Sequence, residues 1–326
     1  MARYFLGVDV GGTKTHALVA DESGQACGFG EAGPGNHESV GYDGLAAALQ
    51  TAIGQALSQV GISAARIAGA GFGVGGYDWP SERAPTLRAI RTLGLDAPLE
   101  AVNDALIGLL AGSEEGWGVA VVAGTGCNAW GWDQARRTGR MTGMGWQMGE
   151  AAGAGELVAE ATRCIARDWS RRGPPTRLTQ AFVALTGAVN AEDLLESITL
   201  RRVVLDASAA PIVFRIAAEG DPAAQQVIEW AGRELGSLAA GVIRQLGFEA
   251  LAFDVVLVGS LYDGGPLLTE AMRRTVQAVA PGARLVRLTV PPVVGGVLLG
   301  MEQAGLDGRA ARGRLMEGTV GASHSP

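Results

Sequence analysis

Phosphate-binding chemistry is suggested by the stretch LGVDVGGTKTHALV, residues 6–19. A hydrophobic run ends in a tight turn that carries Gly11, Gly12, Thr13, Lys14 and Thr15, and a second hydrophobic run follows. Glycine has no Cβ, so the backbone of such a turn can bend sharply and bring its N–H groups close to an anion. The hydroxyls and the lysine add further donors, and Asp9 is suited to hold Mg²⁺ or its bound water. The alternative is an ordinary hairpin, in which the glycines serve only the turn.

Two further pairs of polar residues could do chemistry. Asn36 and His37 lie in the loop GPGNHES and could hydrogen-bond a polar ligand; alternatively, this loop only caps the following helix. Asn103 and Asp104 lie where a short strand gives way to an apolar helix, and a carboxylate there can accept the proton of a substrate hydroxyl. The competing interpretation of Asp104 is a helix N-cap. A helix N-terminus would also lower its pKa, leaving Asp104 ionised but weakly basic.

Composition narrows the classes of partner. The chain has 326 residues, 48% of them hydrophobic, which is enough for about two domains. The formal net charge is −7 and basic residues are not clustered with aromatics, so we expect neither a nucleic-acid partner nor an anionic membrane surface. No apolar run is long enough for a membrane span or a signal peptide, which predicts a cytoplasmic protein. Three widely spaced cysteines predict reduced thiols, with no disulfide framework and no CxxC metal site.

Strands and helices alternate along the first part of the chain. Apolar runs at 4–10, 15–20 and 25–30 predict an antiparallel meander, and helices at 41–60, 81–93 and 105–111 are expected to alternate with strands at 68–74 and 99–102. From Trp117 the pattern begins again, because GVAVVAGTGCNAWGW has the same order of strand, glycine turn and strand. Two such units half a chain apart predict two related α/β domains that face each other across a cleft.

The second half is expected to be mainly helical around a second sheet. A glycine-rich loop at 143–155 precedes a helix, and further helices are predicted at 178–198, 210–218, 223–246 and 267–280, with strands at 253–258 and 284–288. Asp221 and Pro222 are a suitable cap and first residue for the longest helix. We expect domains at 1–115 and 116–310, a last helix at about 293–306 that packs back on the first domain, and a disordered tail at 311–326.

The order of the motifs DVGGTKT, GPGNH, GVGGYD, NDA, AGTGCN, GMGWQMGE, VGSLYDGG and VVGGVLLG resembles the sugar-kinase, heat-shock-protein and actin superfamily. Within it, the chain resembles the N-acetylglucosamine kinases that are related to the BadF/BadG ATPases. The resemblance covers nearly the whole chain. It implies an α/β fold of two ribonuclease-H-like (actin-like ATPase) domains around a central cleft that binds ATP and a sugar. It also makes a homodimer an expected assembly.

The resemblance assigns roles to individual residues. It implies that residues 9–15 form the first phosphate loop, that Asp104 is the catalytic aspartate, and that Mg²⁺ accompanies ATP. The second phosphate loop and part of the adenosine site would be Gly124, Thr125, Gly126, Gly259 and Ser260. The residues around the sugar would be Asn36, Gly76, Asn128, Gly145 and Glu150, with His37 and Asn103 as neighbours able to contact it.

The implied reaction is transfer of the γ-phosphoryl group of ATP to the 6-hydroxyl of an amino sugar, with N-acetylglucosamine as the first expectation. Two departures bear on the choice of sugar: GEAAGAG replaces a GDEGS-like run at Glu150, and Met144-Gly145-Trp146 replaces Trp-Gly-His. Glucosamine is therefore the alternative substrate. Glu150 has the structural alternative of a first-turn helix acid. A different class of function is a partner-activating ATPase of the BadF type, although its shared iron–sulfur cluster needs more closely spaced cysteines than this chain has.

Overall fold

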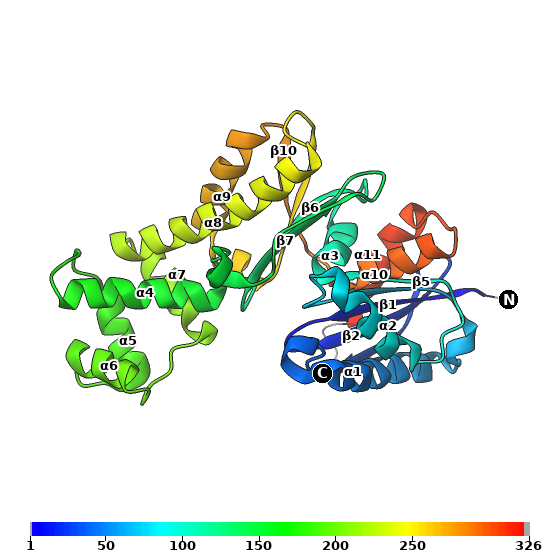
Figure 1. Cartoon of the computed structure of the whole chain (residues 1–326), viewed down its shortest axis with the longest axis horizontal. Helices are drawn as coiled ribbons and strands as arrows, with labels where there is room; N and C mark the ends of the chain where they lie inside the picture. Colours follow the sequence, from blue (N-terminus) through cyan, green and yellow to red (C-terminus); the bar gives the residue numbers. More distant parts are fainter. Residues whose placement is uncertain (1, 323–326) are drawn as a thin grey trace.

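The structure is a computed structural model that describes residues 2–322, and it contains two α/β domains, each built on a five-stranded sheet (Figure 1). The N-terminal sheet consists of β1 (Tyr4–Val10), β2 (Thr15–Asp21), β3 (Ala26–Ala32), β4 (Ile67–Val74) and β5 (Leu99–Asn103). The C-terminal sheet consists of β6 (Gly118–Ala123), β7 (Cys127–Trp132), β8 (Thr138–Arg140), β9 (Phe253–Val258) and β10 (Ala283–Arg287).

Both sheets have the same topology. The N-terminal order is β3-β2-β1-β4-β5 and the C-terminal order, read in the same sense, is β8-β7-β6-β9-β10. In each sheet the first three strands pair antiparallel, and the last two are parallel to the first. The predicted meander and the predicted repeat are therefore confirmed. The short strand β8 was not predicted from the sequence.

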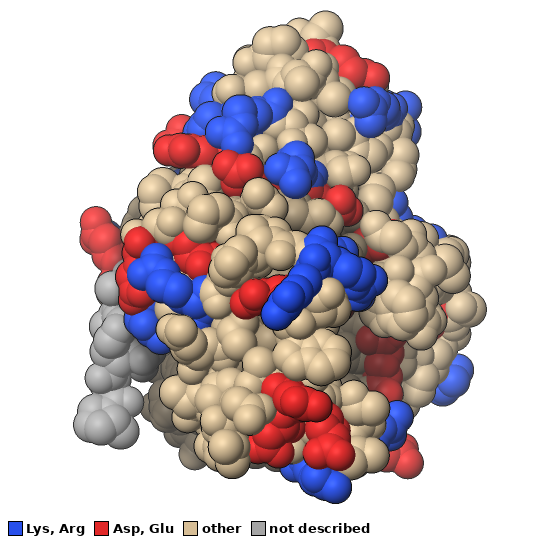
Figure 2. Space-filling view, turned by 90° about the vertical axis from the view of Figure 1, so that its left-hand side faces the viewer, with Lys and Arg blue, Asp and Glu red and all other residues tan. Residues whose placement is uncertain are grey.

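Helices cover the sheets and extend the second domain. The N-terminal domain carries α1 (His37–Val60), α2 (Arg83–Arg91) and α3 (Asp104–Gly112). The C-terminal domain carries α4 (Ala154–Trp169), α5 (Leu178–Thr186), α6 (Ala191–Thr199), α7 (Ala210–Ala218), α8 (Pro222–Leu246) and α9 (Pro266–Val279). Helices α4 to α7 lie on the side of this domain that is remote from the N-terminal sheet (Figure 1). Acidic and basic side chains are interspersed over the face shown in Figure 2.

The region predicted as one helix at 178–198 is two helices. Gly187 adopts a left-handed conformation, with φ 72°, and ends α5. Asn190 then caps α6 by accepting a hydrogen bond from the backbone N–H of Asp193 at 3.0 Å. Glycine is common just after a helix and asparagine is common at a helix N-cap, so the sequence did carry a signal for this break. The hydrophobic periodicity alone did not reveal it. The predicted cap of α8 is confirmed, because Asp221 accepts from the N–H of Ala224 and Pro222 is the first helical residue.

After β10 the chain returns to the first domain as α10 (Val293–Gln303), which packs against β1, β4 and α3. This packing needs glycine on both surfaces. A Cβ on Gly7 of β1 would lie 2.5 Å from the carbonyl oxygen of Val293, and a Cβ on Gly295 would lie 1.8 Å from the carbonyl oxygen of Ile107. Backbone atoms cannot move aside as a flexible side chain can, so these glycines set how closely the elements approach.

Residues 309–322, most of which were placed in a disordered tail, form a last helix, α11 (Arg309–Ala322), so that expectation is wrong for them. Residues 323–326 lie outside the described residues. Arg312 donates hydrogen bonds to the carbonyls of Leu110, Ala111 and Ser113, and thus satisfies the C-terminal end of α3. Of the helices in the described part of the chain, none combines the length and apolar character needed to cross a membrane.

An apolar cluster joins the two domains. It contains Leu106 and Leu110 of α3 and Val297 of α10, together with Trp130 of β7 and Val256 of β9. Separate clusters fill the interior of each domain. The junction between the domains is therefore a packed apolar region around α3 and α10.

The contact of α10 with α3 can be tested at Gly295. Replacement by alanine forces its Cβ against the Ile107 carbonyl, and we expect the free energy of unfolding to fall by about 1–3 kcal/mol. Gly313→Ala is the matched control, because nothing lies within 4 Å of the added Cβ and alanine favours a helix. Thermal unfolding of both variants measures the difference; equal melting temperatures would contradict the close approach.

Candidate active site

Two glycine turns occupy equivalent places in the two sheets. The β1–β2 turn is closed by a hydrogen bond from the N–H of Gly11 to the carbonyl of Lys14 at 2.8 Å, and the β6–β7 turn by one from Gly124 to Gly126 at 2.9 Å. Around Gly12, Gly124 and Gly126 there is open space where a Cβ would be. Both turns thus present accessible backbone, as anion binding requires.

Side chains next to the first turn differ in their accessibility. Thr13 is exposed, and Lys14 is exposed with its Nζ 3.7 Å from Oε2 of Glu31. Thr15 is fully buried, and a Cβ on Gly35 would lie 2.7 Å from its Oγ1. The hydroxyl of Thr15 is buried without a hydrogen-bond partner among the described residues.

A cavity of about 570 Å³ opens next to the second turn. Of the predicted nucleotide residues, Gly124, Thr125 and Ser260 line it. Gly259, with φ 106°, packs so closely on Ala123 that a Cβ would lie 2.3 Å from its carbonyl oxygen. The lining residues that sequence reasoning missed are Ala154, Ala207, Ser208, Ala210, Pro211, Phe214, Leu261, Asp263 and Gly264.

Phe214 and Gly264 shape this cavity. A Cβ on Gly264 would lie 2.4 Å from the Phe214 ring, so the ring lies directly against the glycine backbone. The N–H of Ala154, the first residue of α4, donates to the carbonyl of Gly124 at 2.9 Å and joins the helix to the turn. A flat apolar wall beside a glycine turn has the form expected of a site for a nucleoside with its phosphates.

Asp104 is the first residue of α3 and is not its cap. The cap is Asn103, whose Oδ1 accepts from the N–H of Ala105 at 3.0 Å, so the N-cap interpretation of Asp104 is wrong. Burial, followed by the negative charge of Asp78, raises the pKa of Asp104 to about 7. Backbone N–H groups at the start of α3 lower this pKa, as expected, but by less than burial raises it. Asp104 is therefore more basic than the sequence analysis expected.

Asp9 is the second-last residue of β1, just before the glycines. It lies close enough to Asp104 for their charges to interact. Burial first, and then the charge of Asp104, raises the pKa of Asp9 to about 7. Gly75, which follows β4, completes this corner: its N–H donates to the carbonyl of Val10 at 2.8 Å, and a Cβ there would lie 3.3 Å from Oδ2 of Asp104. Two carboxyl groups that share a poorly solvated corner favour a cation or a proton between them.

Asp78 is the functional residue that the sequence analysis missed. Its side chain is only 6% exposed, and its Oδ1 accepts hydrogen bonds from Nδ2 of Asn103 at 3.1 Å and from Nδ2 of Asn128 at 3.0 Å. Burial raises the pKa of Asp78 to about 6, and the hydrogen bond from Asn128 opposes that rise. The motif GVGGYD contained this residue, but nothing local distinguished it from a surface acid.

Asn36 and Gly76 lie against each other beyond the C-terminal end of β4. Asn36 caps α1 by accepting from the N–H of Glu38 at 2.9 Å, so the capping alternative is confirmed for this residue. A Cβ on Gly76, with φ 79°, would lie 2.4 Å from Oδ1 of Asn36. His37 is directed elsewhere: it stacks on Tyr42 with ring centroids 4.5 Å apart, and its Nε2 is 3.6 Å from Oε1 of Glu82.

Glu150 supports the glycine-rich loop from within. It is 4% exposed and accepts from the N–H groups of Thr142 at 2.6 Å and Gly143 at 2.9 Å, while its own N–H donates to the carbonyl of Gly145 at 3.0 Å. Helix α4 begins only at Ala154, so the interpretation of Glu150 as a first-turn acid is wrong. Both carboxylate oxygens are occupied by backbone donors.

The raised pKa of Asp104 makes a prediction about stability. With a native pKa near 7 and an unfolded value near 3.8, the native state binds more protons between these values, so stability falls as pH rises through this window. Asp104→Asn removes this effect, and we expect the melting temperature of the variant, relative to the unmodified protein, to increase from pH 4.5 to pH 7.5. Asp206→Asn is the pH-independent control over this range, because hydrogen bonds from Ser208 lower the pKa of Asp206 and its carboxylate is ionised in the native and the unfolded state alike. A pH-independent difference for Asp104→Asn would contradict the shift.

Comparison with known proteins agrees with this geometry. An N-acetyl-D-glucosamine kinase from Dictyostelium discoideum is 24% identical over 91% of this chain and 97% of its own length. An N-acetylmuramic acid/N-acetylglucosamine kinase from Clostridium acetobutylicum is 24% identical over 91% of this chain and 98% of its own length. The solved structure of a presumed N-acetylglucosamine kinase from Chromobacterium violaceum has a TM-score of 0.64 at 22% identity, covering 91% of this chain and 98% of that one.

The structural likeness establishes the fold: two ribonuclease-H-like domains, as predicted. The BadF/BadG/BcrA/BcrD ATPase family matches residues 6–300, which include both glycine turns, Asp78, Asp104 and the nucleotide-sized cavity. Membership of an ATPase family implies the use of ATP. This chain is a member of the BadF/BadG/BcrA/BcrD ATPase family.

Proposed function

We propose that this protein is an ATP-dependent kinase that transfers the γ-phosphoryl group to the 6-hydroxyl of an amino sugar, with N-acetylglucosamine as the first candidate and glucosamine as the alternative. The observation that carries the proposal is the position of Asp104. It stands in a partly buried corner beside the first glycine turn, with a pKa of about 7. The names of the curated relatives support the class of acceptor.

The two domains have different roles in the proposed reaction. The cavity beside Gly124 and Phe214 receives the nucleoside, and the two open turns supply backbone N–H groups to its phosphates. Asp104 accepts the proton of the attacking sugar hydroxyl, and a pKa near the working pH suits a base of this kind. Phosphoryl transfer depends mainly on alignment and charge stabilisation, which two domains facing one cleft can provide.

Mg²⁺ fits the donor set at the corner of Asp9. A nucleotide-bound Mg²⁺ is held by one or two carboxylates, with phosphate oxygens and waters completing its shell. The described residues contain no group of three metal-ligating side chains, which is consistent with a metal that arrives with its nucleotide. Asp9 would hold the ion, directly or through water, and the ion would offset negative charge on the phosphates.

The sugar would be recognised by amides and backbone groups from both domains. Asn128 of the C-terminal domain and Asn103 of the N-terminal domain meet at Asp78, and Gly76 lies against Asn36. Gly145 lies in a loop whose exposed side chains are Met144, Trp146 and Met148. Because this loop differs from the resembled pattern, the acyl substituent of the sugar is the feature that it would select.

We also propose a homodimer in the cytoplasm, following the family resemblance. The partner-activating alternative has no structural support among the described residues. Cys27, Cys127 and Cys164 lie on β3, β7 and α4 as free thiols, and burial raises the pKa of Cys127 to about 12, which disfavours a thiolate ligand there.

Asp104→Asn tests the assigned base. We expect sugar-dependent turnover to fall about 100-fold or more while binding of an ATP analogue changes little, since the cavity lies in the other domain. In the unmodified enzyme, kcat should fall as pH drops below about 7, because protonated Asp104 cannot accept the proton. Retention of normal turnover by the variant would remove Asp104 from this role.

The choice of acceptor is tested by ADP release with Mg²⁺-ATP and N-acetylglucosamine, glucosamine, N-acetylmannosamine, N-acetylmuramic acid, glucose or no sugar. We expect one amino sugar to stimulate release strongly over the sugar-free rate. Mass spectrometry of the product would locate the phosphate. Hydrolysis that no sugar stimulates would refute the kinase assignment and favour the partner-activating alternative.

A further inference from the structure

Asp78 lies where the two domains touch beside the cleft. It belongs to the N-terminal domain, in the loop after β4, yet Nδ2 of Asn128 on β7 donates to its Oδ1 at 3.0 Å. Gly143, after β8, is so close that a Cβ there would lie 2.4 Å from Oδ2 of Asp78. Both contacts cross from one domain to the other, so this carboxylate joins the two walls of the site.

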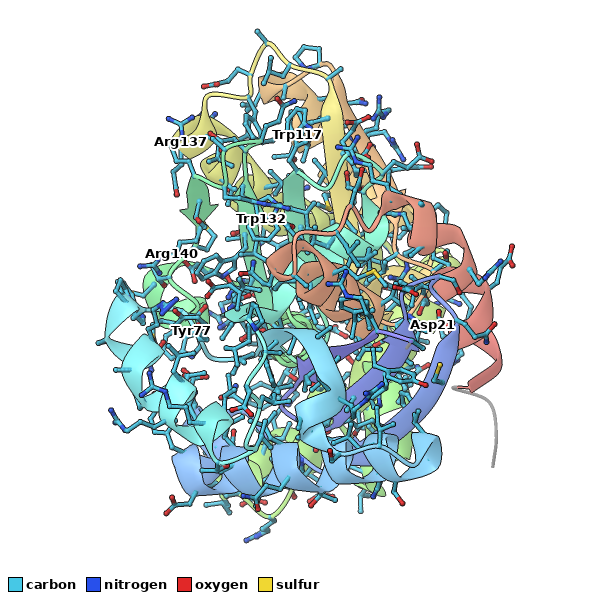
Figure 3. All side chains as sticks on the ribbon, turned by 90° about the vertical axis from the view of Figure 1, so that its right-hand side faces the viewer. Asp21, Tyr77, Trp117, Trp132, Arg137 and Arg140 are labelled. Carbon is cyan, nitrogen blue, oxygen red and sulfur yellow. The ribbon has the colours of Figure 1, made fainter. Side chains whose placement is uncertain are left out.

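The backbone that carries Asp78 is held within its own domain. Oε2 of Glu82 accepts the backbone N–H of Asp78 at 2.8 Å and that of Trp79 at 2.7 Å. Arg140 of β8 stacks over the Trp79 ring at 4.4 Å, which adds a second link between the domains. Figure 3 shows Tyr77 and Arg140 on the two sides of this junction.

Asp78 also determines the direction of two asparagine amides. The Oδ1 of Asn103 accepts from the N–H of Ala105 at 3.0 Å, and that of Asn128 from the N–H of Ala129 at 2.8 Å. A backbone N–H group holds the oxygen of each amide, so the planar amide can place its Nδ2 in few positions. Both Nδ2 atoms donate to Oδ1 of Asp78. The carboxylate therefore fixes one amide in each domain.

We propose that Asp78 is a positioning residue that clasps the two domains together and orients Asn128 for the sugar; the sugar-binding part of this inference rests on the proposed function. An acceptor with nearly no exposure needs donors to offset its desolvation, and the two amides supply them. When Asn128 is drawn away by opening of the cleft, the buried carboxylate loses a donor. Closing the cleft restores it, so the clasp favours the arrangement in which Asn128 is held against Asp78.

An exchange of hydrogen-bonding roles tests the clasp. Asn128→Asp places two carboxylates against each other and should open the contact. Adding Asp78→Asn to that variant places an amide donor opposite the new carboxylate, at the cost of the hydrogen bond from Asn103, because both asparagines contact the same Oδ1. Asp78→Ala removes the acceptor altogether. Asp307→Ala, at an exposed position before α11, is the matched control.

Two readouts separate the clasp from the proposed function. Hydrogen exchange of residues 138–150, whose loop faces Asp78, should be faster in Asp78→Ala and Asn128→Asp and return toward the unmodified rate in the double variant. Calorimetry with N-acetylglucosamine should show affinity about tenfold or more weaker in Asp78→Ala, with the affinity for an ATP analogue unchanged within twofold. Unmodified exchange in Asp78→Ala, or a double variant no better than Asn128→Asp, would overturn the clasp. Failure of the unmodified protein to bind the sugar would refute the proposed substrate, while the exchange result would still decide whether the clasp exists.

Discussion

A chain of three poorly solvated carboxyl groups, in which Asp104 interacts with both Asp9 and Asp78, is the constraint on which the rest of the site depends. Asp9, Asp78 and Asp104 come from three separate places in the N-terminal domain, and burial raises the pKa of each. Such a group is costly unless donors or cations compensate it. Amides from both domains compensate Asp78, and this leaves Asp104 with a charged neighbour and a proton affinity near neutrality. Burial of these charged groups therefore gives Asp104 the basicity that the proposed reaction needs.

The duplicated sheet explains how such a site can be built from short motifs. Each domain uses the same strand order, so each places its glycine turn at the same end of its first hairpin. The apolar cluster around α3 and α10 joins the two domains. The large number of glycines follows from this design, since Gly7 and Gly295 allow backbone to meet backbone where side chains would separate α10 from β1 and α3.

Much of this could be predicted from the sequence wherever the determinant was local. Hydrophobic periodicity located most strands and helices, and the glycine turns identified themselves by composition. The significance of Asp78 could not be predicted, because it arises from hydrogen bonds to residues 25 and 50 positions away. Phe214 was missed for the same reason. Glu150 was assigned to the sugar, but whether its side chain would face a ligand or turn inward to backbone N–H groups depends on the path of the loop, which its composition does not specify.

The end of α3 has a consequence for how the chain is made. The helix that begins with Asp104 is completed by Arg312, and the N-terminal sheet is covered by α10, yet both arrive about 200 residues later. While the ribosome is still producing the second domain, the first therefore lacks one covering layer and the cap of its central helix. Many two-domain proteins can complete the first domain before the second emerges. Here the first domain to be synthesised is finished only by segments that follow the second domain in the chain.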